Sequence, residues 1–146
     1  SALGCVHPGQ VLNLLMRLKG RAETDYIFIT HNLSVVEYIS DRIAVMYLGR
    51  IVELASTEQI FENTMHPYTE ALLSAILWWT RIQAQPHCAG GDVPPGPSAE
   101  GCHFHPRCKN CMDICMHKKP ELKRHMINGE EHFCACHSMT RSGWGF

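Results

Sequence analysis

The chain has 146 residues, of which 45% are apolar and 18% charged, and its formal net charge at pH 7 is −1. This length suits one ordinary domain. The balanced charge, without a long basic run, argues against a phosphate-tracking nucleic-acid surface. The best apolar stretch, 71–79, is far too short to span a membrane, and no basic-then-apolar signal peptide opens the chain.

The first predicted element is an amphipathic helix over residues 9–19. Its apolar side chains recur at spacings of three, four and seven, which places them on one helical face. Pro8 and Gly9 lie at its start, where proline is tolerated, and Gly20 can end it. The apolar stripe is most simply core, and consists of Val11, Leu14, Leu15 and Leu18.

The short run Tyr26–Thr30 predicts a β-strand buried on both faces, because it is apolar, β-branched and aromatic. His31 follows at the carboxyl end of this strand. In open α/β sheets that edge is where ligands bind. A histidine at this place can also simply end a strand.

A short helix with Leu33, Val36 and Ile39 on one side comes next. It leads into two further predicted strands, Ile43–Leu48 and Ile51–Leu54. The two residues between them, Gly49-Arg50, predict a hairpin turn.

Two helices are predicted after this hairpin. Ser56 and Gln59 have the spacing of a capping box, so a helix should cover Thr57–Glu62. Pro67 then suits the first turn of a second helix. The second helix has its apolar stripe at Tyr68, Leu72, Leu73 and Ile76.

Glycine and proline concentrate in residues 77–100, which predicts a linker. The eight cysteines are unevenly spread, and most follow Glu100. Without a secretory signal, such a cluster favours metal ligation over disulfides. The segment 101–137 also has few large apolar residues, so it needs a staple to hold one shape. The clustered cysteines are Cys102, Cys108, Cys111, Cys115, Cys134 and Cys136.

The stretch ITHNLSVVEYISDRIAVMYLGRIVEL resembles the switch-histidine region of ABC-transporter ATPases. It is most similar to the ATP-binding subunits of oligopeptide and dipeptide importers. The resemblance covers residues 1–76 and returns from about residue 91 to 137, where GCHFHPRCKNCMDIC carries it. Because the chain starts within a motif and without methionine, we expect a further N-terminal part.

The resemblance implies an α/β fold, a partial ABC-type nucleotide-binding domain with its C-terminal strands, hairpin and helices, followed by a cysteine-rich, loop-rich extension. We expect about one parallel strand from the ATPase core. The implied organisation is ATPase domain over 1–76, linker over 77–100, cysteine-rich extension over 101–137, and a disordered tail over 138–146.

Two motifs of the resemblance bear on ATP. Ser1, Ala2, Leu3 and Gly4 resemble the D-loop, which helps to couple two ATP sites across a dimer, although the family has aspartate at the fourth position. His31 matches the switch histidine, which contacts the γ-phosphate and the attacking water.

Asn32 stands where the family usually has aspartate, and both can bond to the following helix start. The phosphate cradle Gly-x-x-x-x-Gly-Lys-Ser/Thr is not in the sequence. An acidic Walker B end and an ABC signature are also missing from it. We therefore hypothesise that this chain does not hydrolyse ATP alone, whereas the complete protein would use ATP and Mg²⁺.

Four cysteines match family positions that, in some members, are associated with a [4Fe–4S] cluster, for which four thiolates are the normal ligand set. The additional Cys111 and Cys134 create shorter spacings that suit Zn²⁺, with His137 or His103 as a nitrogen ligand. Sequence alone leaves iron–sulfur, zinc and unliganded thiols open. The four matching residues are Cys102, Cys108, Cys115 and Cys136.

The function implied by the resemblance is that of an ATP-binding subunit that couples ATP hydrolysis to oligopeptide or dipeptide import. Its partners would be a second ATP-binding subunit, transmembrane permease subunits and, indirectly, a peptide-binding protein, with no nucleic acid. It would lie on the cytoplasmic side of the plasma (inner) membrane. The alternatives are a free-standing metal-binding or redox module and an inert truncated gene product.

Overall fold

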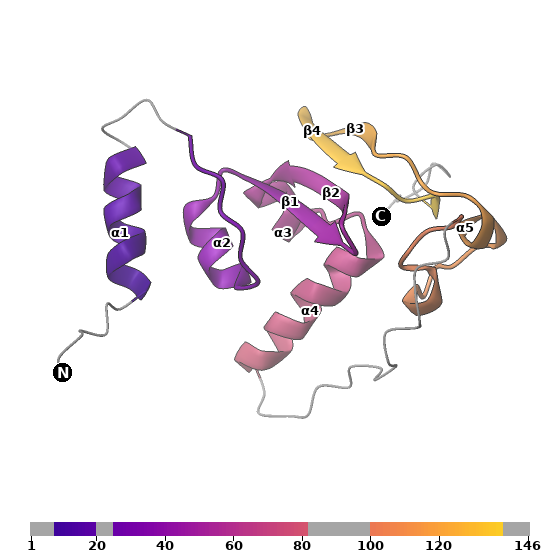
Figure 1. The fold of residues 1–146 in the computed structure, drawn as a ribbon, viewed down its shortest axis with the longest axis horizontal. Helices are drawn as coiled ribbons and strands as arrows, with labels where there is room; N and C mark the ends of the chain where they lie inside the picture. Colours follow the sequence, from indigo (N-terminus) through magenta and orange to yellow (C-terminus); the bar gives the residue numbers. More distant parts are fainter. Residues whose placement is uncertain (1–7, 20–24, 82–99, 139–146) are drawn as a thin grey trace. The chain divides into compact units, whose positions relative to one another are not determined.

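A computed structural model describes residues 8–19, 25–81 and 100–138 (Figure 1). The chain divides between Asp41 and Arg42 into two compact units. The N-terminal unit contains α1 (Pro8–Lys19) and α2 (Leu33–Ile39), and every strand that the structure describes lies in the C-terminal unit. No helix in the described part is long and apolar enough to cross a membrane.

Both helices of the N-terminal unit agree with the sequence patterns. α1 begins at Pro8 and ends at Lys19, as the apolar spacing predicts. α2 is capped by Asn32, whose side-chain oxygen accepts a hydrogen bond from the Val35 backbone N–H at 3.3 Å. This cap satisfies one of the amide groups that the first turn of a helix leaves unpaired.

The prediction of a doubly buried strand at Tyr26–Thr30 is wrong for the described structure. Residues 25–30 are in no strand, and the side chains of Ile27 and Ile29 are 94% and 95% exposed. A strand needs a neighbouring strand to pair its backbone N–H and C=O groups. No strand of the described part pairs with this segment.

The C-terminal unit is built on one four-stranded antiparallel sheet, in the order β1-β2-β4-β3 (Figure 1). The predicted hairpin is present as β1 (Arg42–Tyr47) and β2 (Arg50–Ser56). The cysteine-bearing extension adds β3 (Lys123–Ile127) and β4 (Glu130–Cys134). The α/β class is confirmed, but the expected parallel strand is absent from the described strands, because both pairs are hairpins joined through an antiparallel seam.

The turn of the first hairpin is shifted by one residue from its predicted place. Tyr47 pairs with Arg50, so the two turn residues are Leu48 and Gly49 rather than Gly49-Arg50. Their φ angles are 45° and 75°. A two-residue hairpin turn with two positive φ values matches the right-handed twist of its strands. The two turn residues of the second hairpin, Asn128 and Gly129, also have positive φ angles, of 53° and 86°.

One face of this sheet is buried and the other is partly open, as the alternation of strand side chains requires. On β1, Ile43 and Val45 are buried while Ala44 and Met46 are exposed. The pairing places the buried side chains of β1, β2 and β4 together on one face. This buried set is Ile43, Val45, Glu53, Ala55, His132 and Cys134.

The two helices after β2 begin where the sequence predicts. Ser56 caps α3 (Thr57–Glu62), its hydroxyl accepting the Gln59 backbone N–H at 3.3 Å. α4 (Pro67–Arg81) begins at Pro67, so helix continues into the first residues of the predicted linker. The remaining linker residues, 82–99, and the tail residues 139–146 lie outside the described part.

Phe104 fixes the start of the extension against the first hairpin and α4. It is 6% exposed and contacts the rings of Tyr47 and Tyr68, with centroids 5.4 and 5.5 Å apart. Short helices follow at η1 (His105–Arg107) and α5 (Asp113–His117). Aromatic edge-to-face contacts of this kind add to the stabilisation from burial.

Candidate functional site

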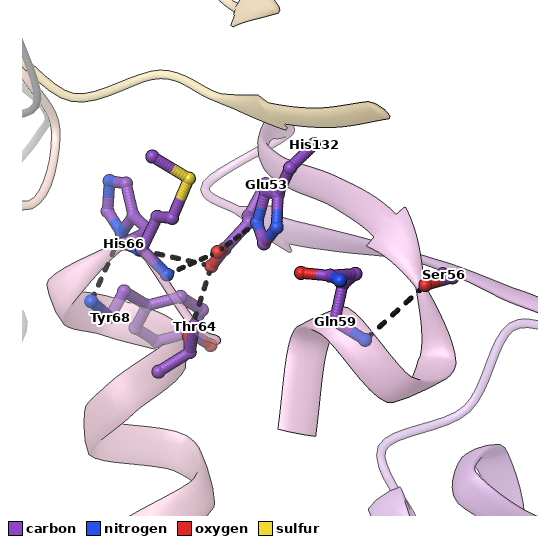
Figure 2. A network of polar contacts seen from close by, with 8 residues as sticks. Glu53, Ser56, Gln59, Thr64, His66, Tyr68 and His132 are labelled. Carbon is purple, nitrogen blue, oxygen red and sulfur yellow. Dashed lines mark hydrogen bonds and ion pairs between the residues drawn. The ribbon is translucent and has the colours of Figure 1, made fainter. Parts of the chain in front are cut away.

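The Glu53 carboxylate on β2 accepts four hydrogen bonds within the C-terminal unit. It is fully buried, and Figure 2 shows it between His132 and the start of α4. Oε1 accepts hydrogen bonds from the Met65 backbone N–H at 2.6 Å and from His132 Nε2 at 2.7 Å. Oε2 accepts from the His66 backbone N–H at 3.2 Å and the Thr64 hydroxyl at 3.4 Å. A buried carboxylate is tolerated only with such compensation.

His132 reaches Glu53 because β4 lies beside β2. The register pairs Glu53 with Cys134, so His132, two residues earlier, points to the same buried face. Its side chain is 0% exposed, like that of Glu53. His132 Nδ1 and Gln59 Oε1 are both buried without a hydrogen-bond partner among the described residues.

The electrostatics of Glu53 favour the ionised form. Burial alone raises the pKa of the carboxyl, but the hydrogen bond from His132, the Met65 backbone N–H and the His132 charge lower it. The net pKa lies below the ordinary value for glutamate. Hydrogen bonds to the charged form have this effect even in a desolvated site.

His66 completes the network by capping α4. Its Nδ1 accepts the Tyr68 backbone N–H at 3.1 Å, and the side chain is 1% exposed (Figure 2). Burial lowers the pKa of His66 to about 4, although the charge of Glu53 acts in the opposite direction. His66 is therefore neutral at pH 7, which keeps Nδ1 available as an acceptor.

Since Glu53 and His132 are fully enclosed, neither can meet a substrate in this structure. A carboxylate–imidazole pair is a common acid–base device in enzymes, but such groups need access to the reacting proton. The network therefore joins segments: it connects β2, β4 and the residues that lead into α4. Sequence analysis missed Glu53, His66 and His132 as interacting residues.

The structure brings the four predicted cysteines close enough to interact electrostatically. After burial, which is the largest cause, the charges of Cys115 and Cys136 raise the pKa of Cys102, and the same two residues together with Cys102 raise the pKa of Cys108. All six described cysteines are free thiols. Burial first, and then Cys136 and Cys102, raise the pKa of Cys108 to about 11, so that thiol is protonated at pH 7.

Backbone and side-chain hydrogen bonds support the loops that carry these thiols. The Cys102 backbone N–H donates to the Cys115 carbonyl at 2.8 Å, and His105 Nδ1 lies 2.8 Å from the Cys102 carbonyl oxygen. Cys134 is 1% exposed, and burial raises its pKa most, followed by the charge of Glu53. Cys111 is exposed.

Proximity of the thiols is not by itself a metal site. In the part of the chain that the structure describes, no group of three or more His, Cys, Asp or Glu side chains is arranged to hold a metal ion. The arrangement therefore does not fit the predicted [4Fe–4S] cluster or zinc.

The predicted ATP-related residues belong to the N-terminal unit. His31 is exposed, between residues 25–30 and the Asn32 cap of α2. An open groove of about 450 Å³ lies in this unit, but His31 is not among its lining residues, which are Leu12, Phe28, Ile29, Thr30, Asn32, Val35 and Ile39. The D-loop residues Ser1, Ala2, Leu3 and Gly4 lie outside the described part.

Comparison with protein families finds a match for part of the chain. Residues 52–115 match the family described as "Oligopeptide/dipeptide transporter, C-terminal region". The matched range contains most of β2 with the Glu53 carboxylate, all of α3 and α4, and three of the four predicted cysteines. The resemblance to the C-terminal portion of an oligopeptide or dipeptide ABC-transporter ATP-binding subunit is thereby confirmed.

Individual relatives are similar over most of this chain. The dipeptide transport ATP-binding protein DppF of Haemophilus influenzae is 44% identical over 127 residues, which are 86% of this chain and 39% of that protein. The oligopeptide transport ATP-binding protein AppF of Bacillus subtilis is 39% identical over 141 residues, which are 94% and 42%. The chain thus spans about two fifths of the length of these relatives.

Proposed function

We propose that this chain acts as the C-terminal portion of the ATP-binding subunit of an ABC importer for oligopeptides or dipeptides. The observation that carries this proposal is the match of residues 52–115 to the C-terminal region of such transporters. The identity to DppF and AppF extends it over most of the chain. In this role the subunit works on the cytoplasmic side of the inner membrane, with permease subunits and a second ATP-binding subunit.

His31 is the residue of the chain to which we assign the chemistry. It would contact the γ-phosphate of ATP and the attacking water, since an imidazole can donate a hydrogen bond to phosphate while neutral and add charge when protonated. Its exposed position, ahead of the capped helix α2, leaves it accessible to a ligand. The assignment of Ser1–Gly4 to the dimer contact depends on the sequence resemblance alone.

The phosphate cradle and magnesium ligands needed for phosphoryl transfer are not in this sequence. We therefore infer that ATP turnover by the isolated chain does not exceed that of its His31→Ala variant. Turnover clearly above that variant would contradict this inference.

A chimera tests the proposed function itself. We would replace the C-terminal portion of Haemophilus influenzae DppF with this chain and measure peptide uptake and ATP turnover together with the permease. The expected result is a working transporter whose turnover His31→Ala reduces by at least about a hundredfold, within the range of a catalytic group. His117→Ala, at an exposed position of α5, is the matched control. A well-folded chimera without activity would contradict the proposal.

The four predicted metal-ligating cysteines have no assigned role in this proposed function beyond the metals that four thiolates could bind. Four thiolates suit a [4Fe–4S] cluster and also zinc, but the observed arrangement fits neither, so we derive no step through a metal. Elemental analysis of chain purified without oxygen measures this directly. About four irons per chain would support the cluster and about one zinc the tetrahedral site, and in either case the thiols would have to rearrange. Neither metal would agree with the described arrangement.

A further inference from the structure

We propose that Glu53 is a latch that holds the β3–β4 hairpin on the β1–β2 hairpin, and that the latched hairpin protects the Cys134 thiol from reaction. This inference concerns a reversible contact within the chain. It does not rest on the proposed function, since it needs neither ATP nor peptide. Its readout is the chemical reactivity of one buried side chain.

The backbone seam between the two hairpins is short. β2 and β4 are registered over two residue pairs, Glu53 with Cys134 and Leu54 with Phe133. One more backbone hydrogen bond extends it, from the Ala135 N–H to the Val52 carbonyl at 2.8 Å. Within the hairpins the registered pairs are six for β1–β2 and five for β3–β4. Each hairpin is therefore better paired internally than the two are to each other.

Side chains across the seam make up for this short pairing. The fully buried contact is Glu53 Oε1 with His132 Nε2 at 2.7 Å. A second contact, from the Ser56 hydroxyl to Glu130 Oε2 at 2.8 Å, lies at an exposed place. Removing one partner of a buried charged contact costs far more than removing one partner of an exposed contact, because the buried partner is left without compensation while water solvates the exposed one. The buried contact is therefore the one that holds the seam.

The remaining donors to Glu53 are on its own side of the seam. Thr64, Met65 and His66 belong to the segment between α3 and α4. Figure 2 shows Thr64 and His66 beside the carboxylate. When the β3–β4 hairpin moves away, these donors stay with the carboxylate and water can replace His132. When the β3–β4 hairpin has separated from the β1–β2 hairpin, the Glu53 carboxylate therefore still has hydrogen-bond partners. When Glu53 is missing instead, His132 and three polar groups lose their common partner, and the docked state is weakened.

Cys134 reports the state of the latch. Its side chain is 1% exposed and lies opposite Glu53 in the register. A thiol in that position can react with a reagent only after the seam opens. Cys111, which is exposed, is an internal reference that does not depend on opening.

The test is pulsed alkylation of the full 146-residue chain, reduced and treated with a chelator, with iodoacetamide in native buffer. Mass spectrometry of peptides then gives the labelling rate at each cysteine. In Glu53→Ala the rate at Cys134 should rise at least about tenfold, which corresponds to about 1.4 kcal/mol of opening free energy. The rate at Cys111 should change by less than about twofold, within the spread expected when a local change leaves an exposed site untouched.

Glu130→Ala is the matched control, because it removes the exposed carboxylate contact across the same seam. It should leave the Cys134 rate within about twofold of the unmodified chain. An equal rise in both variants would overturn the latch, because any seam contact would then act alike. An unchanged Cys134 rate in Glu53→Ala would overturn it as well.

Hydrogen–deuterium exchange separates opening of the latch from general unfolding. In Glu53→Gln, which keeps the size of the side chain and removes its charge, faster exchange should be confined to β3, β4 and residues 64–66. The backbone amides that form hydrogen bonds between β1 and β2 should keep their protection from exchange. If Glu53→Ala does not fold, the exchange pattern of Glu53→Gln is the test of the latch. Equal acceleration in β1 and β3 would show one cooperative unit, and would exclude a latch.

Discussion

Glu53 Oε1 and His132 Nε2 lie 2.7 Å apart, although the two residues are 79 positions apart in the sequence. Both side chains are fully buried, so the contact excludes water. It joins the segment that matches the transporter family, 52–115, to a strand beyond that match. The C-terminal hairpin is therefore part of the packed unit of the family region.

Loss of the Glu53 carboxylate should strongly destabilise the C-terminal unit. Removing one partner of a buried pair leaves the other uncompensated, which typically costs about 3–5 kcal/mol. We expect Glu53→Ala to lower the free energy of unfolding by about this amount in urea titrations followed by circular dichroism. Glu62→Ala, at the exposed end of α3, should change it by less than about 0.5 kcal/mol. A loss below about 1 kcal/mol for Glu53→Ala would show that the pair contributes little.

Local signals in the sequence account for most elements that were predicted correctly. The side chains of Ser56 and Asn32 each fix a helix start through a hydrogen bond to a backbone N–H three residues on, and Pro67 does so through its restricted φ angle. Such interactions need no knowledge of the rest of the fold. The second hairpin could also have been found, because Asn128-Gly129 is a strong turn signal. It was missed because β3 and β4 are short and rich in charged residues, unlike a typical strand.

The candidate site was less predictable because its contacts are not local. Glu53 meets His132 only after β4 pairs with β2, and nothing in the spacing of these residues indicates that pairing. At Tyr26–Thr30 the sequence predicted a strand that the structure does not contain. Its composition is that of a buried strand, yet strand formation depends on a neighbour that the composition does not supply.

Acid should destabilise the C-terminal unit through His66. Burial lowers its pKa from 6.5 to about 4, so between these pH values the unfolded chain binds a proton that the folded chain does not. Its contribution is fully present above pH 6.5 and is lost as the pH falls toward 4. The loss should total about 3 kcal/mol. The lowered pKa of Glu53 adds a further loss below pH 4.5, as that carboxylate is protonated.

Urea titrations at pH 7 and at about pH 4.5 measure this effect. His66→Asn retains a side-chain oxygen that can cap α4 but removes the titrating ring, so its difference between the two pH values should be smaller. His117→Asn makes the same chemical change at an exposed position of α5 and should leave the difference as it is. An unaltered pH dependence in His66→Asn would refute the assignment to His66.

The first hairpin turn can be stabilised at Leu48. This residue has φ of 45°, which is unfavourable for leucine by about 1 kcal/mol or more. Its side chain is 46% exposed, so little packing is lost on replacement. Leu48→Asn should raise the free energy of unfolding by about 1 kcal/mol, measured by urea titration. The reciprocal change, Asn128→Leu in the second turn, should lower it by a similar amount, and equal signs for both changes would contradict this explanation.

A methyl group at position 101 should disturb the start of the extension. A Cβ on Gly101 would lie 2.5 Å from the Met116 carbonyl oxygen and 2.6 Å from that of Cys115, and backbone atoms cannot move aside cheaply. We expect Gly101→Ala to lower the free energy of unfolding by about 1–3 kcal/mol and to speed alkylation of the buried Cys115. Gly129→Ala meets no atom within 4 Å, so it adds backbone strain alone, with a cost of about 1 kcal/mol. Faster labelling of Cys115 should follow only the change at Gly101; the same increase in Gly129→Ala would show that the crowding is not the cause.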